Sequence, residues 1–290
     1  MMSASKEQRE RKRTIYNSSS QVLAYADDLA FLTRSIIDMK ELHAKLEEPA
    51  AAVGLEINQE KSKYLIVSRS KRSQHLGQNL TLGDNNFEKV QKFKYLGATI
   101  TGENNATPEV NERIASGNRS LYGLYNVFKS KWITVNTKKI IYKTVTRPAV
   151  MYGSETWTLT TKNQLALETL ERKILRKIYG PLRDKKTGEW RARYNQELYE
   201  LYNDQTFTGA IRSQRLRWID HVQRMSELRI PKISFTSTPD GTRLRGRPRK
   251  RYGEMLKEDF KILKINNWQA VAQNRTEWRK VVWETQTRQS

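Results

Sequence analysis

The dominant spacing of apolar residues along this chain changes near residue 105, and that change limits the possible folds more than any other feature. Before it, short apolar runs alternate with turn-forming residues, which is typical of strands and hairpins. After it, apolar residues recur at intervals of three and four, which is typical of helices that bury one face. The sequence therefore predicts an α+β chain in which hairpins come first and helices follow.

The first hairpin is expected over residues 21–33. Apolar residues there flank two adjacent acids, which predicts two short buried strands joined by a tight turn in which Asp adopts unusual backbone angles. Residues 35–52 have helical spacing, although we expect Pro49 to end or kink that helix early.

The next segments are shorter and more polar. Residues 55–68 suggest a strand interrupted by a turn at 58–61. A polar stretch at 69–86 follows, and residues 93–101 predict a second hairpin.

Five apolar stripes at helical spacing make up the rest of the chain. They lie at residues 110–128, 140–150, 167–178, 211–225 and 271–281. The first three look like a bundle, and Gly180-Pro181 is expected to end the third helix. The stretch 231–251 is rich in Pro, Gly and Arg and is interpreted as an exposed linker.

The balance of charge limits the possible partners. Lys and Arg number 53 against 31 Asp and Glu, a formal net charge of +22, which indicates a polyanion and predicts salt-dependent binding. Nucleic acid is the leading candidate. An anionic membrane surface is the competing interpretation, but no apolar run approaches the roughly 18 residues that a span needs. We therefore expect no membrane partner.

The chain contains no cysteine. This excludes disulfide partners, zinc sites with Cys ligands and thiol catalysis. The polar amino terminus lacks the apolar segment of a secretory signal. We expect an intracellular protein, nuclear and cytoplasmic.

The tetrad Tyr25-Ala26-Asp27-Asp28 is the first feature that indicates chemistry. Joining a nucleotide to a primer needs two Mg²⁺ ions about 3.5–4 Å apart, clamped by aspartates on a rigid hairpin. The alternative is a solvated Asp-Asp β-turn, which is common. The apolar strands on both sides favour the metal-binding interpretation.

The tetrad resembles the catalytic signature of reverse transcriptases, and the segments after it are similar, in order, to non-LTR retrotransposon enzymes. These segments are Gly-Leu-Glu-Ile-Asn at 54–58 with Lys-Ser-Lys at 61–63, Phe-Lys-Tyr-Leu-Gly at 93–97, Arg-Pro-Ala at 147–149, Tyr-Gly-Ser-Glu-Thr-Trp at 152–157, Ser-Gln-Arg-Leu-Arg-Trp-Ile-Asp-His-Val at 213–222 and Gly-Arg-Pro-Arg at 246–249. The resemblance covers nearly the whole chain. It implies a basic flexible tail at 1–20, a partial palm at 21–104, an all-α thumb at 105–182 and a basic helical region at 183–290.

The resemblance also implies roles for single residues of the palm. Asp27 would coordinate Mg²⁺, with Asp28 beside it as a weaker ligand or supporting acid, and Tyr25 would pack under the primer terminus. Lys61 stands where the family places a lysine near the departing pyrophosphate, where an ammonium offsets developing charge or donates a proton. A solvated turn lysine is the alternative for Lys61.

The second hairpin corresponds to the family's primer grip. Phe93, Tyr95 and Gly97 would press on the primer backbone, with ordinary hairpin packing as the alternative. The implied partners are an RNA template and a DNA primer or target DNA.

One part of the family's active site has no counterpart in this sequence. A working polymerase of this kind needs a further aspartate from an upstream strand, but only 24 residues precede Tyr25 and none is Asp. The family's fingers and endonuclease domain are likewise absent. We therefore expect a fragment of an RNA-directed DNA polymerase that binds primer–template and is inactive alone. The alternatives are a non-catalytic nucleic-acid-binding protein derived from such an element, and a decaying copy without a selected role.

A basic stretch lies near the carboxy-terminal end. Its cations are Arg243, Arg245, Arg247, Arg249, Lys250 and Arg251, with no acid among them. Within it, Arg245-Gly246-Arg247-Pro248-Arg249 resembles an AT-hook, whose extended core enters a narrow A·T minor groove. A nuclear-import signal and a plain solvated linker are the other interpretations.

Four tryptophans and one histidine have structural interpretations. Trp218, Trp268, Trp278 and Trp283 are able to stack bases, but their helical spacing favours core positions. His221 has no His or Cys partner nearby in the sequence, so we interpret it as a structural residue.

Overall fold

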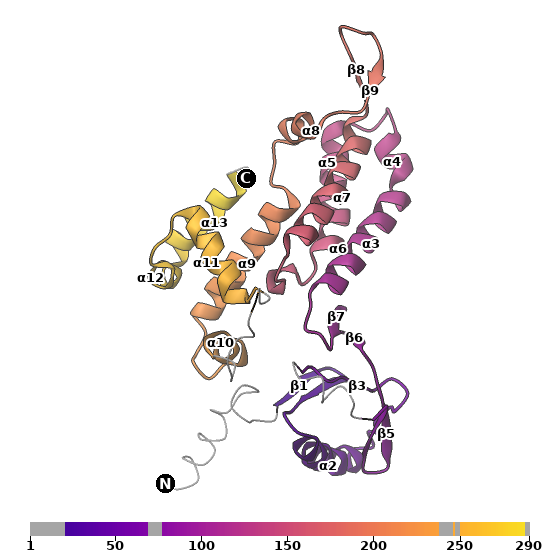
Figure 1. Cartoon of the computed structure of the whole chain (residues 1–290), viewed down its shortest axis with the longest axis vertical. Coiled ribbons are helices and arrows are strands. Elements are labelled where there is room, and N and C mark those ends of the chain that lie inside the picture. Colours follow the sequence, from indigo (N-terminus) through magenta and orange to yellow (C-terminus); the bar gives the residue numbers. More distant parts are fainter. Residues whose placement is uncertain (1–20, 69–76, 238–245, 247–249, 288–290) are drawn as a thin grey trace. The chain divides into compact units, whose positions relative to one another are not determined.

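The computed structural model describes residues 21–68, 77–237, 246 and 250–287 (Figure 1). The chain divides into two compact units. One, called here the hairpin unit, is Met1–Asn105 with Met225–Pro248; the other, called the helical unit, is Ala106–Arg224 with Arg249–Ser290. The predicted α+β class is confirmed.

In its described residues, the hairpin unit contains small sheets, one long helix and one short helix. Its elements are β1 (Gln21–Tyr25), β2 (Asp28–Leu32), α2 (Ile36–Ala52), β3 (Lys63–Tyr64), β4 (Asn79–Leu82), β5 (Asn85–Lys89), β6 (Lys92–Tyr95), β7 (Ala98–Thr101) and α10 (Ile230–Thr236). The pairs β1–β2 and β6–β7 form the two predicted antiparallel hairpins. Strand β5 pairs antiparallel with β4 and parallel with β3.

The sheet of β3, β5 and β4 corrects two expectations. The strand predicted at 55–68 is only two residues long. The polar stretch 69–86, in which no strand was predicted, contains β4 and the start of β5. Leu80, Leu82 and Phe87 alternate with polar residues and form the buried core of this sheet. Because side chains at a period of two lie on one face of a strand, these few apolar residues share the buried face of the sheet.

Helix α2 continues through Pro49 to Ala52, so Pro49 does not end it early. The residue lies in the last turn, where the loss of one backbone donor disturbs few further hydrogen bonds. Helix α10 corrects the linker expected at 231–251. Residues 231–236 are helical, with Pro231 in the first turn, where its fixed φ suits a helix and its missing N–H costs nothing.

The helical unit contains the predicted bundle. Its elements are α3 (Thr107–Gly123), α4 (Tyr125–Lys129), α5 (Val135–Ile141), a π-helical segment (Tyr142–Thr146), α6 (Arg147–Met151), a 3₁₀ segment (Ser154–Thr156), α7 (Thr161–Tyr179), β8 (Leu182–Arg183), β9 (Trp190–Arg191), α8 (Asn195–Tyr202), α9 (Phe207–Gln223), α11 (Tyr252–Leu263), α12 (Trp268–Gln273) and α13 (Arg275–Thr287). Helix α7 ends at Gly180, whose φ is 68°, as predicted. The stripe expected at 271–281 is divided between α12 and α13.

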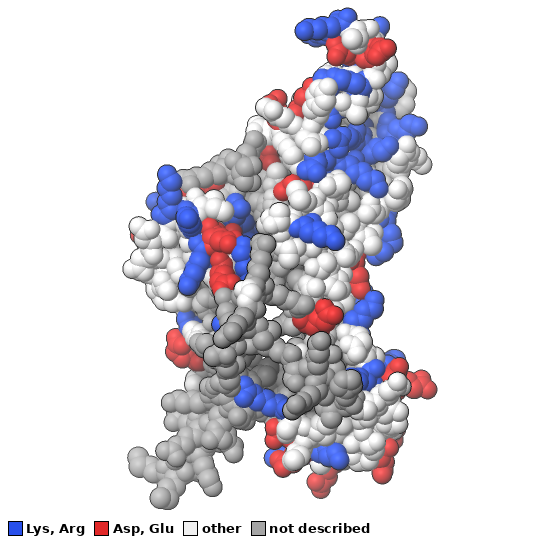
Figure 2. All heavy atoms as spheres, viewed as in Figure 1, with Lys and Arg blue, Asp and Glu red and all other residues white. Residues whose placement is uncertain are grey.

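The helices α3, α6 and α7 pack very closely. A Cβ atom on Gly117 of α3 would lie 2.6 Å from a methyl of Val150 and 2.7 Å from a methyl of Leu170. The π-helical segment ends at Thr146, two residues before Pro148. Because Pro148 cannot donate to the carbonyl of Thr144, the wider turn adapts the backbone to the proline. Figure 2 shows that Lys and Arg gather over one end of this bundle.

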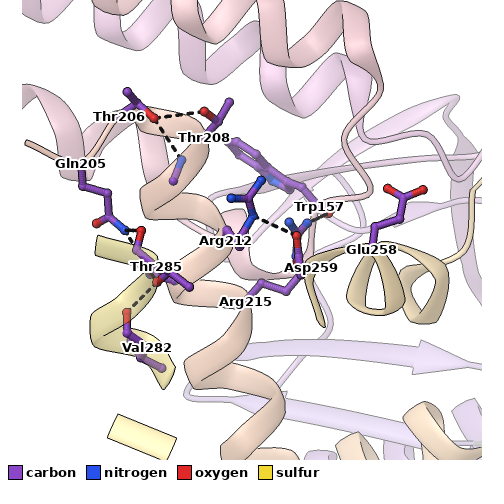
Figure 3. A network of polar contacts seen from close by, with 12 residues as sticks. Trp157, Gln205, Thr206, Thr208, Arg212, Arg215, Glu258, Asp259, Val282 and Thr285 are labelled. Carbon is purple, nitrogen blue, oxygen red and sulfur yellow. Dashed lines mark hydrogen bonds and ion pairs between the residues drawn. The ribbon is translucent and has the colours of Figure 1, made fainter. Parts of the chain in front are cut away.

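A buried carboxylate connects α9 with α11 (Figure 3). Asp259 accepts from Nε of Arg212 at 3.1 Å and from Nε of Arg215 at 2.7 Å. Arg215 also donates to the carbonyl oxygen of Trp157 at 3.3 Å. The side chains of Arg215 and Asp259 are 3% and 6% exposed. Loss of the carboxylate would therefore leave the guanidinium of Arg215 buried without its charged partner.

Replacing Asp259 therefore tests how the helical unit is held together. We expect Asp259→Ala to lower the free energy of unfolding by about 3–5 kcal/mol in a denaturant titration, because it leaves the buried guanidinium of Arg215 without a counter-charge. Glu258→Ala is the matched control. It removes the neighbouring carboxylate, which pairs with Lys250 at 2.5 Å with both side chains about half exposed, and should cost less than about 1 kcal/mol. Equal losses in the two variants would contradict the prediction.

A second buried carboxylate, Glu171 of α7, lies at the start of α9. It accepts from the hydroxyl of Tyr142 at 2.8 Å and from the backbone N–H of Phe207 at 3.1 Å. Burial raises the pKa of Glu171 from 4.5 to about 7, although these hydrogen bonds and the nearby Arg147 oppose the shift. The charged form is therefore disfavoured in the folded chain.

This shift predicts a pH-dependent stability. Because the folded pKa lies above the unfolded pKa, the contribution of Glu171 is complete below about pH 4.5 and is lost as the pH rises through 7, by roughly 3 kcal/mol in all. Glu171→Gln should flatten the dependence of the unfolding free energy between about pH 5 and about pH 8. Glu168→Gln, the same change one turn earlier on α7, should retain most of it, because the charge of Glu168 makes only a small contribution to the raised pKa of Glu171. An unchanged pH dependence in Glu171→Gln would refute the assignment.

Candidate catalytic hairpin and nucleic-acid interface

The tetrad lies at the tip of the β1–β2 hairpin, as predicted. Tyr25 pairs with Asp28 across the strands, so Ala26 and Asp27 form a two-residue turn. The left-handed residue is Ala26, with φ of 53°, and not an aspartate as expected. Two-residue hairpins need such a conformation to match the twist of the strands. Both carboxylates are exposed at this tip.

The strands of this hairpin are not buried, which corrects the expectation from their apolar sequence. Tyr25 is 66% exposed and Leu29 is 52% exposed, while Val22 and Phe31 are half-buried. Within the described residues β1 and β2 pair only with each other, and α2 packs on β2. A two-stranded ribbon with a single covering helix cannot bury both of its faces.

Lys61 lies in an exposed turn that hydrogen bonds of neighbouring residues hold in place. The backbone N–H of Lys61 donates to Oδ1 of Asn58 at 3.0 Å. Next to it, Gln59 donates to Asn85 at 2.7 Å, and Asn85 donates to Glu47 of α2 at 2.9 Å. This chain of amides ties the turn to β5 and α2. The ammonium of Lys61 forms no ion pair with Asp27, Asp28 or any other described carboxylate.

The carboxylates at the tip do not make a complete metal site. Mg²⁺ prefers near-octahedral oxygen coordination, and a two-ion site needs carboxylates from more than one segment. Across residues 21–68, 77–237, 246 and 250–287, no three Asp, Glu, His or Cys side chains gather where they would hold a metal. Asp27 and Asp28 therefore supply only part of the donor set that the predicted Mg²⁺ pair requires.

The second hairpin has two chemically different faces. Phe93 and Tyr95 of β6 are half-buried on one face, whereas Lys92 and Lys94 are exposed on the other. Gly97, with φ of 80°, completes the turn to β7. The two lysines were not identified as candidates from the sequence, although the alternating Lys-Phe-Lys-Tyr pattern contains that information.

Most of the predicted AT-hook-like segment lies outside the described residues, namely Arg245, Arg247, Pro248 and Arg249. Gly246 is in a bend with φ of 101°. The last two residues of the basic stretch lie at the start of α11 and are held there by carboxylates of that helix. Lys250 pairs with Glu258, and the backbone N–H of Arg251 donates to Glu254 at 3.0 Å.

The tryptophans divide into core and surface. Trp278 is 2% exposed and donates to the carbonyl of Leu216 at 3.0 Å, so its predicted core position is confirmed. Trp268 stacks on Phe260 with ring centroids 5.0 Å apart. Trp283 is 66% exposed, so the core prediction for it is wrong. His221 is exposed beside Trp218 and is not part of the core.

A basic surface on α3, α4 and α7 was not recognised from the sequence. Lys173 lies over the ring of Tyr122 at 5.0 Å, and Lys177 lies over Tyr125 at 4.8 Å. Lysine and tyrosine pairs on exposed helices can contact both the phosphates and the bases of nucleic acid. The two lysines are four residues apart on α7, and the two tyrosines, on α3 and α4, are three apart. This helical spacing could have indicated the surface from the sequence.

No helix in the described part of the chain is both long enough and apolar enough to cross a membrane.

Comparison with known proteins agrees with the resemblance at a coarser level. Residues 1–100 match the family model of reverse transcriptase (RNA-dependent DNA polymerase). The chain is also 24% identical over 274 residues to a transposon-derived protein of Caenorhabditis elegans, covering 90% of this chain and 94% of that protein. The hairpin carrying Asp27 and Asp28 thus lies in a reverse-transcriptase-like region of a chain similar to a transposon-derived protein.

Proposed function

We propose that this chain is a portion of the reverse transcriptase of a non-LTR retrotransposon that binds a primer–template duplex and does not polymerise by itself. The observation that supports this most is the position of Asp27 and Asp28. They lie at a two-residue turn inside the region that matches the reverse transcriptase family. In this proposal Asp27, Asp28 and Lys61 correspond to the family's catalytic groups.

The second hairpin would contact the nucleic-acid backbone. Lys92 and Lys94 are exposed along one face of β6, and the half-buried Phe93 and Tyr95 brace the other face. A row of lysines at strand spacing of about 7 Å is close to the spacing of phosphates along one strand of a duplex. The net charge of +22 supports the same partner.

The second candidate function is a non-catalytic nucleic-acid-binding protein derived from such an element. It is favoured by the cations and tyrosines of α3, α4 and α7, since they need no catalytic carboxylate. The two candidates differ in which unit binds the duplex: the hairpin unit in the first and the helical unit in the second. If the first candidate is right, Lys92→Gln/Lys94→Gln would weaken duplex binding. If the second is right, Lys173→Gln/Lys177→Gln would weaken it and Lys92→Gln/Lys94→Gln would not.

Binding of a labelled RNA–DNA primer–template, measured by fluorescence anisotropy across a range of salt concentrations, tests the proposed partner. We expect affinity to fall steeply with salt, and Lys92→Gln/Lys94→Gln to reduce the slope of log K against log salt by about 1.8, or about 0.9 for each lost phosphate contact. The exposed pair Lys257→Gln/Lys261→Gln on α11 is a control with the same change of charge. An identical reduction in the control would refute a specific role for the second hairpin.

A primer-extension assay tests whether the chain polymerises by itself. The purified 290-residue chain should incorporate no nucleotide into the same primer in the presence of Mg²⁺, and should be indistinguishable from Asp27→Asn. A full-length reverse transcriptase on the same substrate confirms that the assay works. Metal-dependent extension that disappears in Asp27→Asn would contradict the proposal, because it would mean that the remaining metal ligands are present in this chain.

A further inference from the structure

The hairpin β8–β9 continues from the carboxy-terminal end of α7 (Figure 1). Its turn is well defined: the N–H of Asp184 donates to the carbonyl of Glu189 at 2.8 Å, and the N–H of Gly188 donates to that of Asp184 at 2.9 Å. The carboxylate of Asp184 accepts from the N–H of Lys186 at 2.8 Å. The tip therefore has a fixed shape, with Lys185 and Lys186 exposed on it.

The base of this hairpin is held against the end of α7. Arg193 donates from Nε to the carbonyl of Gly180 at 3.1 Å. Arg176 of α7 donates to the side chain of Asn195 at 2.7 Å. These contacts set the direction of the ribbon relative to the bundle, so its exposed side chains extend a surface of the helical unit.

Lysine and arginine greatly outnumber acids around this hairpin, and one arginine pairs with two of the nearby acids. Residues 172–194 contain nine Lys and Arg but only two Asp and Glu. Arg191 pairs with Asp184 at 3.7 Å and with Glu197 at 2.6 Å, and its hydrogen bonds lower the pKa of Glu197 to about 2. Lys185 and Lys186 form no ion pair within the described residues, so their charge faces solvent.

Two large aromatic rings are exposed in this part of the helical unit. Trp190 of β9 is 70% exposed, and Trp132, in the connection from α4 to α5, is 97% exposed. That connection lies at the same end of the bundle as β8–β9 (Figure 1), in keeping with the 4.8 Å contact between Lys177 near the end of α7 and Tyr125 of α4. We call the set Lys131, Trp132, Lys177, Lys185, Lys186 and Trp190 the basic-aromatic end.

We propose that the basic-aromatic end binds an unpaired RNA strand, with the lysines on its phosphates and Trp132 and Trp190 stacked on its bases. Exposed rings need free base faces, which a single strand offers and a duplex hides except at its ends. A membrane surface fits less well, because interfacial anchoring needs a continuous apolar face and here the rings alternate with charges. The site follows from this geometry; the choice of RNA over DNA rests on the proposed function.

The test measures binding of a labelled oligouridine of about 20 nucleotides to the full chain by fluorescence anisotropy. Trp132→Ala/Trp190→Ala should weaken binding by at least about tenfold, since each stacked base is worth on the order of a tenfold change. Lys185→Gln/Lys186→Gln should reduce the salt slope by about 1.4, which is about 0.7 for each single-strand phosphate contact. All four side chains are exposed, so circular dichroism should report an unchanged fold.

The matched aromatic control is Trp283→Ala, which removes a 66% exposed ring from α13 of the same unit. It should bind oligouridine as the parent chain does. Parent-like binding by Trp132→Ala/Trp190→Ala, or an equal loss in Trp283→Ala, overturns the proposal. So does oligodeoxythymidine that binds more tightly than oligouridine, or a tryptophan dependence found only with phosphatidylserine vesicles.

A blunt RNA–DNA duplex, measured with the same variants, separates this inference from the proposed function. Duplex binding that persists without any tryptophan-dependent oligouridine binding overturns the inference alone. Tryptophan-dependent oligouridine binding without duplex binding supports the inference and overturns the proposed function.

Discussion

The ion pairs of Asp259 determine how the helical unit can exist as one body. That unit is built from two stretches of chain, Ala106–Arg224 and Arg249–Ser290. Asp259 joins them through Arg212 and Arg215, 47 and 44 residues away, and the indole of Trp278 adds a hydrogen bond to the carbonyl of Leu216. Since a buried charge is tolerated only when its partners are in place, the second stretch can pack on α9 in few ways.

The hairpin unit is organised differently, and this explains why its candidate catalytic groups are so exposed. Its described core consists of three buried apolar side chains, Leu80, Leu82 and Phe87, which lie in the β3–β5–β4 sheet and not in the hairpin that carries Asp27. Cross-strand pairing within the hairpin defines the backbone of the tip, while its carboxylates remain in solvent. Carboxylates in that setting repel each other little and need no metal to be stable. The fold of the tip is therefore independent of the chemistry that it would serve in a complete enzyme.

The sequence predicted those elements whose signal is local. Both hairpins and the bundle helices follow from turn residues and apolar periodicity, and Gly180 marks the end of α7 as expected. The strand β4 was missed because Leu80 and Leu82 are too few among polar neighbours to stand out. Burial of Arg215, Glu171 and Asp259 was not predictable, since each is buried by partners far away in sequence. The exposure of Leu29 was missed for the opposite reason: an apolar strand is buried only if something covers it.

The distribution of paired and unpaired charges links these observations to binding. Acids of the helical unit are largely occupied inside it: Asp259 by two arginines, Glu197 and Asp184 by Arg191, and Glu171 by a tyrosine and a helix start. Many lysines instead project into solvent, beside tyrosines and tryptophans. The acids therefore hold the fold together, and the surplus of positive charge stays at the surface. A chain arranged in this way keeps its affinity for polyanions when catalytic carboxylates are incomplete, because binding and chemistry depend on different groups.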